Sequence, residues 1–318
     1  MTAQRLAALA VDVGGSSLKG ALVDVTGRSV RRETVPTPDD GGAAIDAIAA
    51  LIGRLAEQAR VDGLRLVGAG VVTPGTVDDT GTVAYASNLG WRNVPLARLL
   101  TERLGLPVSV GHDVRAAGLA EQLLGGASGE RDFVYIAIGT GVAAALFSGG
   151  AVLPGAQRAA GEVGHVPVHP DGELCTCGQR GCLEVYMSGA GLSRRYLART
   201  GRERSAKQII ARIGHDPDAA EVWGLGVRTL ALGLATLTLT VDPSAIVLGG
   251  GISRAGQALL GPVRSELDRQ LAWRSAPRLV TTALGTEAGR IGAAILAFRH
   301  AGVGDIVTSW PKADALIP

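Results

Sequence analysis

Three cysteines and one histidine lie close together in the middle of the chain. Cys175, Cys177 and Cys182 are its three cysteines, and His165 precedes the first of them by ten residues. Three thiolates and one imidazole make the closed tetrahedral ligand set of a structural Zn²⁺. The alternatives are reactive thiols, or one disulfide with a free thiol, and the odd number of cysteines argues against the disulfide. We therefore predict a structural zinc site that stiffens this loop.

A short segment near the N-terminus combines an acid, two glycines, two hydroxyls and a lysine. Glycines let backbone N–H groups approach phosphate oxygens, hydroxyls donate to them, and a carboxylate can hold Mg²⁺ through water. The candidate phosphate-binding residues are Asp12, Gly14, Gly15, Ser16, Ser17 and Lys19. The segment is neither a Walker A motif nor a Rossmann fingerprint, and a plain hairpin turn is the alternative. A partial repeat at Gly139, Thr140 and Gly141 favours phosphate binding, because two opposed turns could clamp one polyphosphate.

One further carboxylate, Asp113, stands between an apolar segment at residues 107–111 and an Ala-rich segment at 114–124. This position is typical of a helix N-cap. A helix N-terminus also keeps a carboxylate ionised, which suits a base that accepts a proton from an alcohol. The two roles are compatible. Asn88 lies in a predicted loop, where it is either a turn former or a ligand contact, and Trp91 is either a contact or a core residue.

These candidates require strands that end where the turns begin. Apolar residues 9–13 and 18–25 flank the first glycine turn, and residues 133–138 and 142–147 flank the second, which predicts two β-hairpins. The other predicted elements are strands at 30–34, 66–72, 107–111 and 245–248, and helices at 43–60, 95–104, 114–124 and 287–298. The repeated hairpin predicts two related α/β halves that face each other across a cleft.

Charge and hydropathy narrow the classes of function. The chain has 318 residues, with 31 Lys and Arg against 29 Asp and Glu, a net charge of +2 and no block of like charges, so we expect no nucleic-acid partner. Its N-terminus does not read as a signal peptide. The apolar run at residues 229–241 is shorter than the roughly 20 residues of a membrane span. We expect that run to be a buried helix of a cytoplasmic protein without membrane contact.

Taken together, these motifs resemble those of the ROK family, which contains bacterial sugar kinases and sugar-responsive repressors. The resemblance spans nearly the whole chain, and the motifs follow the family's order. They are the phosphate loop at 12–19, the Pro-Gly-x-Val-Asp element at 74–78, the Asn-Leu-x-Trp loop at 88–91, the glycine turn at 139–141, the Gly-Glu-x-Gly-His element at 161–165, the zinc loop at 175–184 and the glycines at 249–251.

The resemblance implies an α/β protein with the actin-like or hexokinase-like (ribonuclease H-like) fold, in two domains with a cleft between them. We expect a smaller domain at residues 1–117 plus 288–318 and a larger one at 118–287. The implied activity is transfer of the γ-phosphate of ATP, with Mg²⁺, to a hexose hydroxyl, usually O6. The family also suggests a homodimer or a homotetramer.

The resemblance further assigns roles to individual residues. Asp113 is expected to be the general base. Substrate-binding residues are expected to be Gly75, Asn88, His112, Asp113, Glu162, His165 and Glu184. The two glycines expected on the adenosine side of the nucleotide are Gly250 and Gly251. His165 is expected to turn one ring nitrogen to zinc and the other to the sugar.

One departure leaves the choice of sugar open. ROK kinases usually have Asn-Asp where this chain has His112-Asp113, and that Asn normally contributes to sugar binding. Glucose is the favoured acceptor, and N-acetylglucosamine or N-acetylmannosamine is the alternative. A sugar-responsive regulator is a third reading, but it requires a DNA-binding segment of roughly 60 to 90 residues before the phosphate loop. An inactive sugar-binding protein is a fourth.

Overall fold

The computed structural model describes residues 5–316, which divide into two compact units. Unit 1 combines the residues up to Ser128 with those from Glu287 onward, and unit 2 is Gly129–Thr286. The first boundary therefore lies after Ser128 and not between residues 117 and 118. The expected position would cut α3 (Asp113–Leu124), which packs against α9 (Ala288–His300) and so stays with unit 1.

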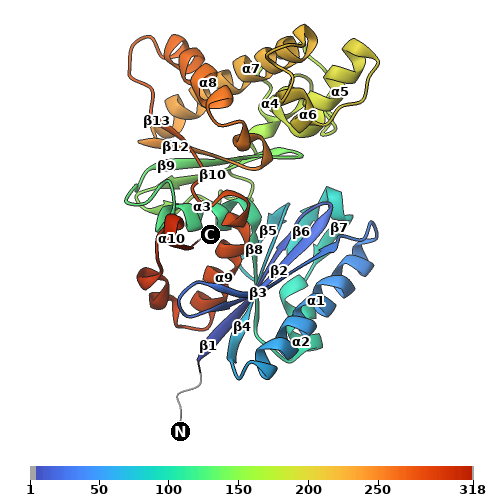
Figure 1. The fold of residues 1–318 in the computed structure, drawn as a ribbon, viewed down its shortest axis with the longest axis vertical. Helices are drawn as coiled ribbons and strands as arrows, with labels where there is room; N and C mark the ends of the chain where they lie inside the picture. Colours follow the sequence, from blue (N-terminus) through green and yellow to red (C-terminus); the bar gives the residue numbers. More distant parts are fainter. Residues whose placement is uncertain (1–4, 317–318) are drawn as a thin grey trace. The chain divides into compact units, whose positions relative to one another are not determined.

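A five-stranded sheet forms the centre of unit 1 (Figure 1). Its strands are β1 (Leu6–Val13), β2 (Ser17–Asp24), β3 (Ser29–Pro36), β4 (Arg65–Thr73) and β8 (Val108–His112), in the order β3-β2-β1-β4-β8. The first three are antiparallel neighbours, whereas β1, β4 and β8 run parallel. The central strand β1 is apolar and almost wholly buried, as a strand covered on both faces must be. The edge strand β3 is polar and half exposed, which discourages pairing with other chains.

Unit 2 repeats this topology. Its strands are β9 (Phe133–Ile138), β10 (Val142–Ser148), β11 (Ala151–Val152), β12 (Ala245–Gly249) and β13 (Arg278–Thr281), in the order β11-β10-β9-β12-β13. Again the first three are antiparallel neighbours and the last two pairings are parallel. The predicted relation between the two glycine-tipped hairpins thus extends to the whole of each sheet.

Helices cover both faces of the sheet in unit 1. The helices α1 (Gly41–Val61) and α2 (Leu96–Leu104) lie on one face, and α9 lies on the other beside α3 (Figure 1). Glycine permits the close approach of α9, because a Cβ at Gly70 would collide with the carbonyl oxygen of Ala293. A Cβ at Gly292 would likewise collide with the carbonyl oxygen of Ala116, so both contacts of α9 require glycine.

The helices of unit 2 are α4 (Leu183–Met187), α5 (Gly189–Thr200), α6 (Ala206–Ile210), α7 (Pro217–Val241) and α8 (Gln257–Gln270). Within residues 5–316, α7 is the one helix long and apolar enough to cross a membrane. It packs against α4, α5 and α8, and 56% of its most apolar window is buried in the unit, as in a core helix. The predicted buried helix at 229–241 is the second half of α7.

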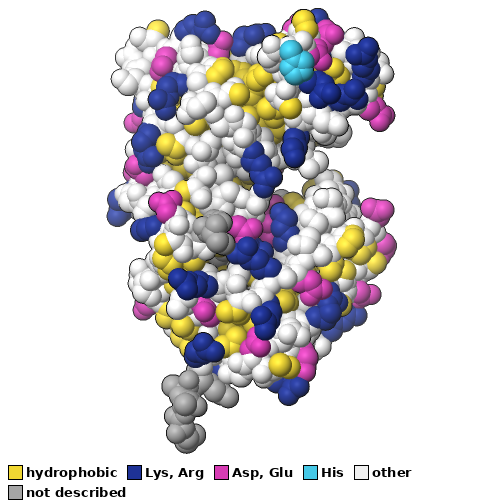
Figure 2. Space-filling view, viewed as in Figure 1, with side chains coloured by type: hydrophobic (Ala, Val, Ile, Leu, Met, Phe, Trp, Pro, Cys, Tyr) yellow, Lys and Arg dark blue, Asp and Glu magenta, His cyan; other side chains and the backbone are white. Residues whose placement is uncertain are grey.

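The remaining elements are short. A three-stranded sheet of unit 1 contains β5 (Thr76–Val77), β6 (Val83–Ala86) and β7 (Trp91–Val94). The 3₁₀ helices are η1 (Ser87–Leu89), η2 (Val163–His165), η3 (Gly251–Ala255), η4 (Gly285–Glu287) and η5 (Gly304–Ser309), and the last α-helix is α10 (Ala313–Leu316). On the face shown in Figure 2, Lys and Arg side chains are interspersed with Asp and Glu, in keeping with the small net charge.

Candidate functional site

The first glycine turn is the tip of the β1–β2 hairpin. The Gly14 N–H donates to the Ser17 carbonyl at 3.0 Å and closes the turn. Gly15 and Ser16 are exposed at the tip. Thr37, just beyond β3, fixes the turn from the side, because its Oγ1 donates to the Gly14 carbonyl at 2.7 Å. No local motif indicated Thr37, because only the pairing of β2 with β3 brings it to the turn.

Two acids of unit 1 lie at the carboxyl-terminal edge of its sheet. Asp12 is near the end of β1 and Asp113 directly follows β8, and both strands run parallel to β4, which lies between them. Burial, and then the charge of Asp113, raise the pKa of Asp12 to about 6, while Lys19 and Arg290 oppose the shift. Lys19 Nζ lies 4.0 Å from Asp12 Oδ2.

Burial also raises the pKa of Asp113 to about 6, against the lowering effect of hydrogen bonds from the backbone N–H groups at the start of α3 and of the charge of Arg115. One of these bonds runs from the Val114 N–H to Asp113 Oδ1 at 2.7 Å. A carboxylate held in this way can accept a proton near neutral pH.

The N-cap of α3 is His112, so the interpretation of Asp113 as the N-cap was wrong. The Arg115 N–H donates to His112 Nδ1 at 3.3 Å, and Asp113 is the first helical residue. His112 is buried, and its Nδ1 lies 3.4 Å from Asp113 Oδ1. The imidazole therefore both caps the helix and borders the candidate base.

The loop containing Asn88 approaches the phosphate turn. A Cβ at Gly15 would lie 3.5 Å from Asn88 Nδ2, so two of the predicted binding elements of unit 1 are neighbours. Trp91 is a core residue, because its ring is buried and its Nε1 donates to the Gly41 carbonyl at 2.9 Å. Gly75 has a φ of +95°, and a Cβ there would collide with the carbonyl of Tyr85 in β6, so the turn between β4 and β5 requires glycine.

The first turn of α9 lies next to Asp12, although no local motif in the sequence indicated this contact. Gly289, in the first turn of α9, is so close that a Cβ there would lie 2.9 Å from Asp12 Oδ2. Two residues of this first turn region, Glu287 and the buried Arg290, form an ion pair, and Arg32 Nη1 lies 3.7 Å from Glu287 Oε2. Glu287, Gly289 and Arg290 are far from Asp12 in the sequence, and only the packing of α9 on the sheet brings them to this edge.

In unit 2, the second glycine turn is bound to Glu184. The Val142 N–H, directly after the turn, donates to Glu184 Oε2 at 2.8 Å. A Cβ at Gly141 would lie 2.5 Å from the same oxygen, so glycine is required for this approach. Gly250 borders the same turn, because its φ is +78° and a Cβ there would collide with the Ile138 carbonyl. Gly251 begins η3.

Glu162 and His165 are carried by a segment that lies against β10. Cβ atoms at Gly161 and Gly164 would collide with the carbonyl oxygens of Ala144 and Val142, respectively. The predicted sugar-binding residues of unit 2, including Glu184, are therefore all anchored to the first half of β10.

The predicted metal ligands converge. The ligand atoms of His165, Cys175, Cys177 and Cys182 lie within 4.8 Å of one another. Cys177 Sγ is 3.7 Å from Cys182 Sγ, and Cys175 Sγ is 3.8 Å from His165 Nδ1. Two thiolates bound to one tetrahedral Zn²⁺ lie about 3.8 Å apart, so the cluster fits this ion. Burial, followed by the neighbouring thiols, raises the pKa of Cys182 to about 12, and a cation would reverse that preference for the protonated form.

Known proteins similar to this chain include members of the ROK family and bacterial sugar kinases. A model of the ROK family matches residues 8–300. A glucokinase from Streptomyces coelicolor is 35% identical over 311 residues, which cover 91% of this chain and 96% of that protein. An N-acetylmannosamine kinase from Escherichia coli is 33% identical, with 91% and 97% covered.

Solved structures place the fold in the same family. The structure of a ROK glucokinase from Streptomyces griseus, in complex with glucose and AMPPNP, has a TM-score of 0.82 and 33% identity, covering 92% of this chain and 99% of that one. The chain therefore belongs to the ROK family and has the actin-like fold of that family's sugar kinases.

Proposed function

We propose that this ATP-dependent sugar kinase phosphorylates O6 of glucose, with Asp113 as the general base. The observation that carries the proposal is Asp113 itself, a carboxylate at the edge of the sheet, held by the N-terminus of α3 and separated by one strand from Asp12. The glucokinase relatives, 35% identical over nine-tenths of the chain, support glucose as the acceptor.

Asp113 would take the proton of the O6 hydroxyl as that oxygen attacks the γ-phosphorus of ATP. The P–O bond to ADP then breaks, and the proton remains on the carboxyl until solvent takes it up. General-base assistance contributes about 10²- to 10⁴-fold in rate. The larger share comes from alignment of the two substrates and from neutralisation of phosphate charge.

The sugar ligands are proposed to come from both units. Unit 1 would supply Gly75, Asn88, His112 and Asp113, and unit 2 would supply Glu162, His165 and Glu184. His112 Nδ1 is bound to the backbone of α3, so a sugar contact would be made by Nε2. His165 Nδ1 faces Cys175, so its sugar contact would also be made by Nε2.

The nucleotide would be held by the two glycine turns and by Gly250 and Gly251. Asp12 would hold Mg²⁺ through water, and its charge fits such an ion, because a divalent cation offsets the cost of ionising a buried carboxylate. When bound, Mg²⁺ neutralises charge on the phosphates. Zn²⁺, held by His165 and the three cysteines, would crosslink the loop and leave no open coordination position. The assembly is proposed to be a homodimer or a homotetramer.

A coupled ADP-release assay tests this proposal. Purified protein with Mg-ATP is compared on glucose, mannose, fructose, N-acetylglucosamine and N-acetylmannosamine. We expect the highest kcat/KM with glucose. We also expect Asp113→Asn to lower kcat about 10²- to 10⁴-fold, although glucose still binds in calorimetry. No turnover with any of the five sugars would refute the proposal, and a kcat of Asp113→Asn within about tenfold of wild type would refute the base assignment.

N-acetylmannosamine is the second candidate acceptor, because a kinase for this sugar is 33% identical over 91% of the chain. The 2-acetamido group distinguishes the two sugars. If N-acetylmannosamine has the higher kcat/KM in the same assay, it replaces glucose as the acceptor. N-acetylglucosamine replaces glucose as the acceptor if its kcat/KM is the highest of the five.

A further inference from the structure

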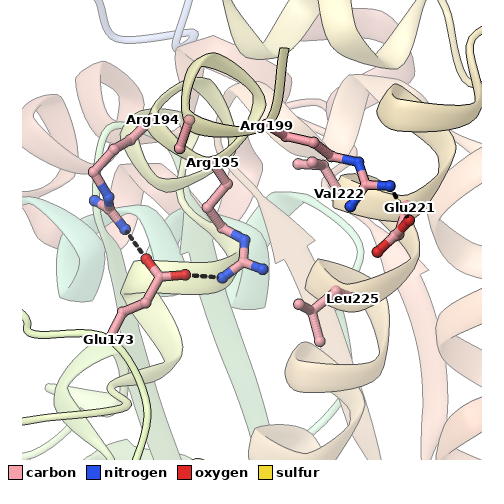
Figure 3. A pocket seen from close by; sticks show the side chains of 8 residues that line it. Glu173, Arg194, Arg195, Arg199, Glu221, Val222 and Leu225 are labelled. Carbon is pink, nitrogen blue, oxygen red and sulfur yellow. Dashed lines mark hydrogen bonds and ion pairs between the residues drawn. The ribbon is translucent and has the colours of Figure 1, made fainter. Parts of the chain in front are cut away.

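Glu173 lies two residues before Cys175, where the zinc loop at 175–184, here called the metal loop, begins. Two successive arginines of α5 bind the Glu173 carboxylate. Arg194 Nη2 donates to Glu173 Oε2 at 3.1 Å, and Arg195 Nη1 pairs with Glu173 Oε1 (Figure 3). Neighbouring residues of a helix point in different directions. The carboxylate is therefore held from two sides where it faces a cavity of about 530 Å³ that Arg199 and Glu221 also line.

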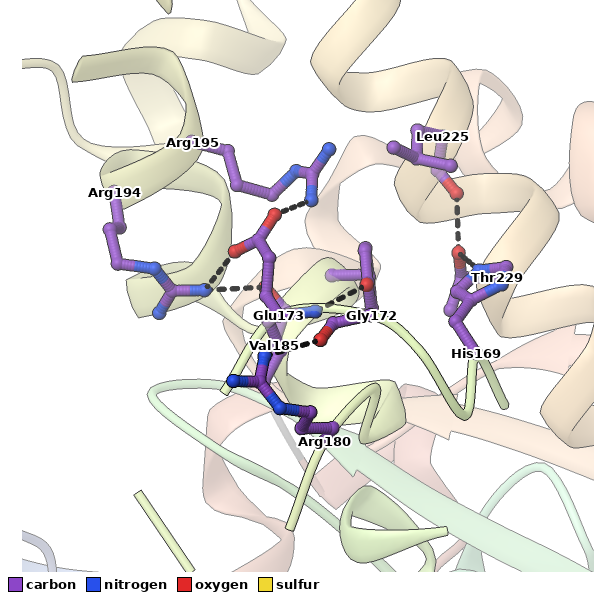
Figure 4. A network of polar contacts seen from close by, with 10 residues as sticks. His169, Gly172, Glu173, Arg180, Val185, Arg194, Arg195, Leu225 and Thr229 are labelled. Carbon is purple, nitrogen blue, oxygen red and sulfur yellow. Dashed lines mark hydrogen bonds and ion pairs between the residues drawn. The ribbon is translucent and has the colours of Figure 1, made fainter. Parts of the chain in front are cut away.

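The same two arginines contact α4. Arg194 Nη2 also donates to the Val185 carbonyl at 3.0 Å (Figure 4). The Arg195 guanidinium lies over the Tyr186 ring, 4.8 Å from its centroid. The Tyr186 hydroxyl accepts a hydrogen bond from the Glu173 N–H at 3.1 Å. Glu173, Arg195 and Tyr186 therefore each contact the other two. The metal loop, α4 and α5 are thus joined by one set of contacts.

This set of contacts reaches both ends of the metal loop. Cys175 follows Glu173 by two residues, and the Gly181 N–H, next to Cys182, donates to the Glu173 carbonyl at 2.8 Å. Cys175, Cys182, Val185 and Tyr186 form one small buried cluster. Any shift of Glu173 would therefore change the separation of two metal ligands.

The contacts also reach the proposed sugar site. Glu184 lies in α4 next to Val185 and is anchored on its other side by the Val142 N–H. The position of its carboxylate thus depends on both anchors of a five-residue helix.

We propose that Glu173, Arg194 and Arg195, here named the clamp, are positioning residues for the metal loop and for Glu184. The clamp holds Cys175 and Cys182 at the separation that a metal ion needs. Through α4 it holds Glu184 in the orientation that contacts the sugar, and this second part rests on the proposed function. Isolated ion pairs on a surface contribute little to stability, so the effect of the clamp is expected in geometry more than in stability.

The test compares the zinc-loaded wild type with Glu173→Gln and with a matched control, Glu221→Gln. Glu221 lines the same cavity but pairs with Arg199 and not with the clamp. The first measurement is the rate of zinc transfer to a chromogenic chelator. We expect transfer about tenfold faster for Glu173→Gln, as for residues that orient metal ligands, and within about twofold of wild type for Glu221→Gln.

The second measurement is steady-state kinetics. For Glu173→Gln we expect the KM for glucose to rise about fivefold, with kcat and the KM for ATP within about twofold, because in the described part of the chain the clamp contacts α4 and makes no direct contact with the second glycine turn. If Glu173→Gln does not fold, Arg194→Gln replaces it in the zinc-transfer measurement, with the same expected increase in rate. The Arg194 side chain is half exposed, so this substitution is expected to leave the fold intact.

Equal zinc-transfer rates for wild type, Glu173→Gln and Glu221→Gln would overturn the clamp. An unchanged KM for glucose beside faster zinc transfer would overturn the part that concerns Glu184. A wild type that does not phosphorylate glucose contradicts the proposed function, whereas faster zinc transfer from Glu173→Gln still supports the clamp on the metal loop.

Discussion

Asp113 combines the two properties that a base for an alcohol needs, a pKa raised by burial and hydrogen bonds to its ionised form. Its raised pKa of about 6 means that the folded state binds a proton more readily than the unfolded state between about pH 4 and 6. The charge on Asp113 therefore destabilises the folded protein above pH 6. As the pH falls through 6, the residue takes up a proton and this destabilisation is lost.

Replacement of Asp113 with Asn should therefore stabilise the protein at pH 7.5. Asn keeps an oxygen for the Val114 N–H and removes the buried charge, so we expect a gain of about 1 to 2 kcal/mol in the free energy of unfolding. The gain should vanish near pH 4, where Asp113 is protonated. Urea unfolding at the two pH values measures it, and a loss of stability at pH 7.5 would contradict the burial argument.

Gly141 offers a second prediction for a single residue. A Cβ here would lie 2.5 Å from Glu184 Oε2 and displace that carboxylate, whereas a Cβ at Gly139 would meet nothing within 4 Å. We expect Gly141→Ala to raise the KM for glucose about tenfold through lost binding energy, and Gly139→Ala to leave it within about twofold. Equal effects of the two variants would show that Glu184 does not depend on this approach.

Among the elements, the two hairpins could be predicted from sequence because their signals are local: apolar strands on either side of glycine turns. Their shared strand order could not, because parallel pairing of β1 with β4 and β8 depends on segments far apart in the chain. The same reason explains why Thr37 and the first turn of α9 were missed beside the phosphate turn. The metal ligands were found because three of the four lie in one short loop.

The start of α3 explains why His112 can stand where ROK kinases usually have Asn. Asn is among the best N-cap residues, and His112 performs this role through Nδ1. His112→Asn should therefore keep the stability of the protein within about 0.5 kcal/mol, whereas His112→Ala should lose about 1 kcal/mol. Thermal unfolding compares the two variants. A similar loss in both would show that the imidazole stabilises the protein in another way.

The whole molecule consists of two units that each have their own apolar core. The core of unit 2 centres on residues of its sheet and of α7, and that of unit 1 centres on β1, β4 and α1. Unit 2 is also continuous in sequence, from Gly129 to Thr286, and contains all four predicted metal ligands. A continuous segment with its own core and a metal site can fold alone.

Expression of residues 129–286 alone should therefore separate metal binding from catalysis. We expect this fragment to unfold cooperatively and to hold about one zinc per chain, because its ligand set is complete. It should bind glucose at least about a hundredfold more weakly than the whole chain, since the proposed contacts from Asn88 and Asp113 are missing and each lost hydrogen bond weakens binding. Metal analysis and calorimetry provide the measurements. Glucose affinity equal to that of the whole chain would show that unit 2 alone makes the sugar site, because contacts supplied by unit 1 cannot contribute to binding by a fragment that lacks them.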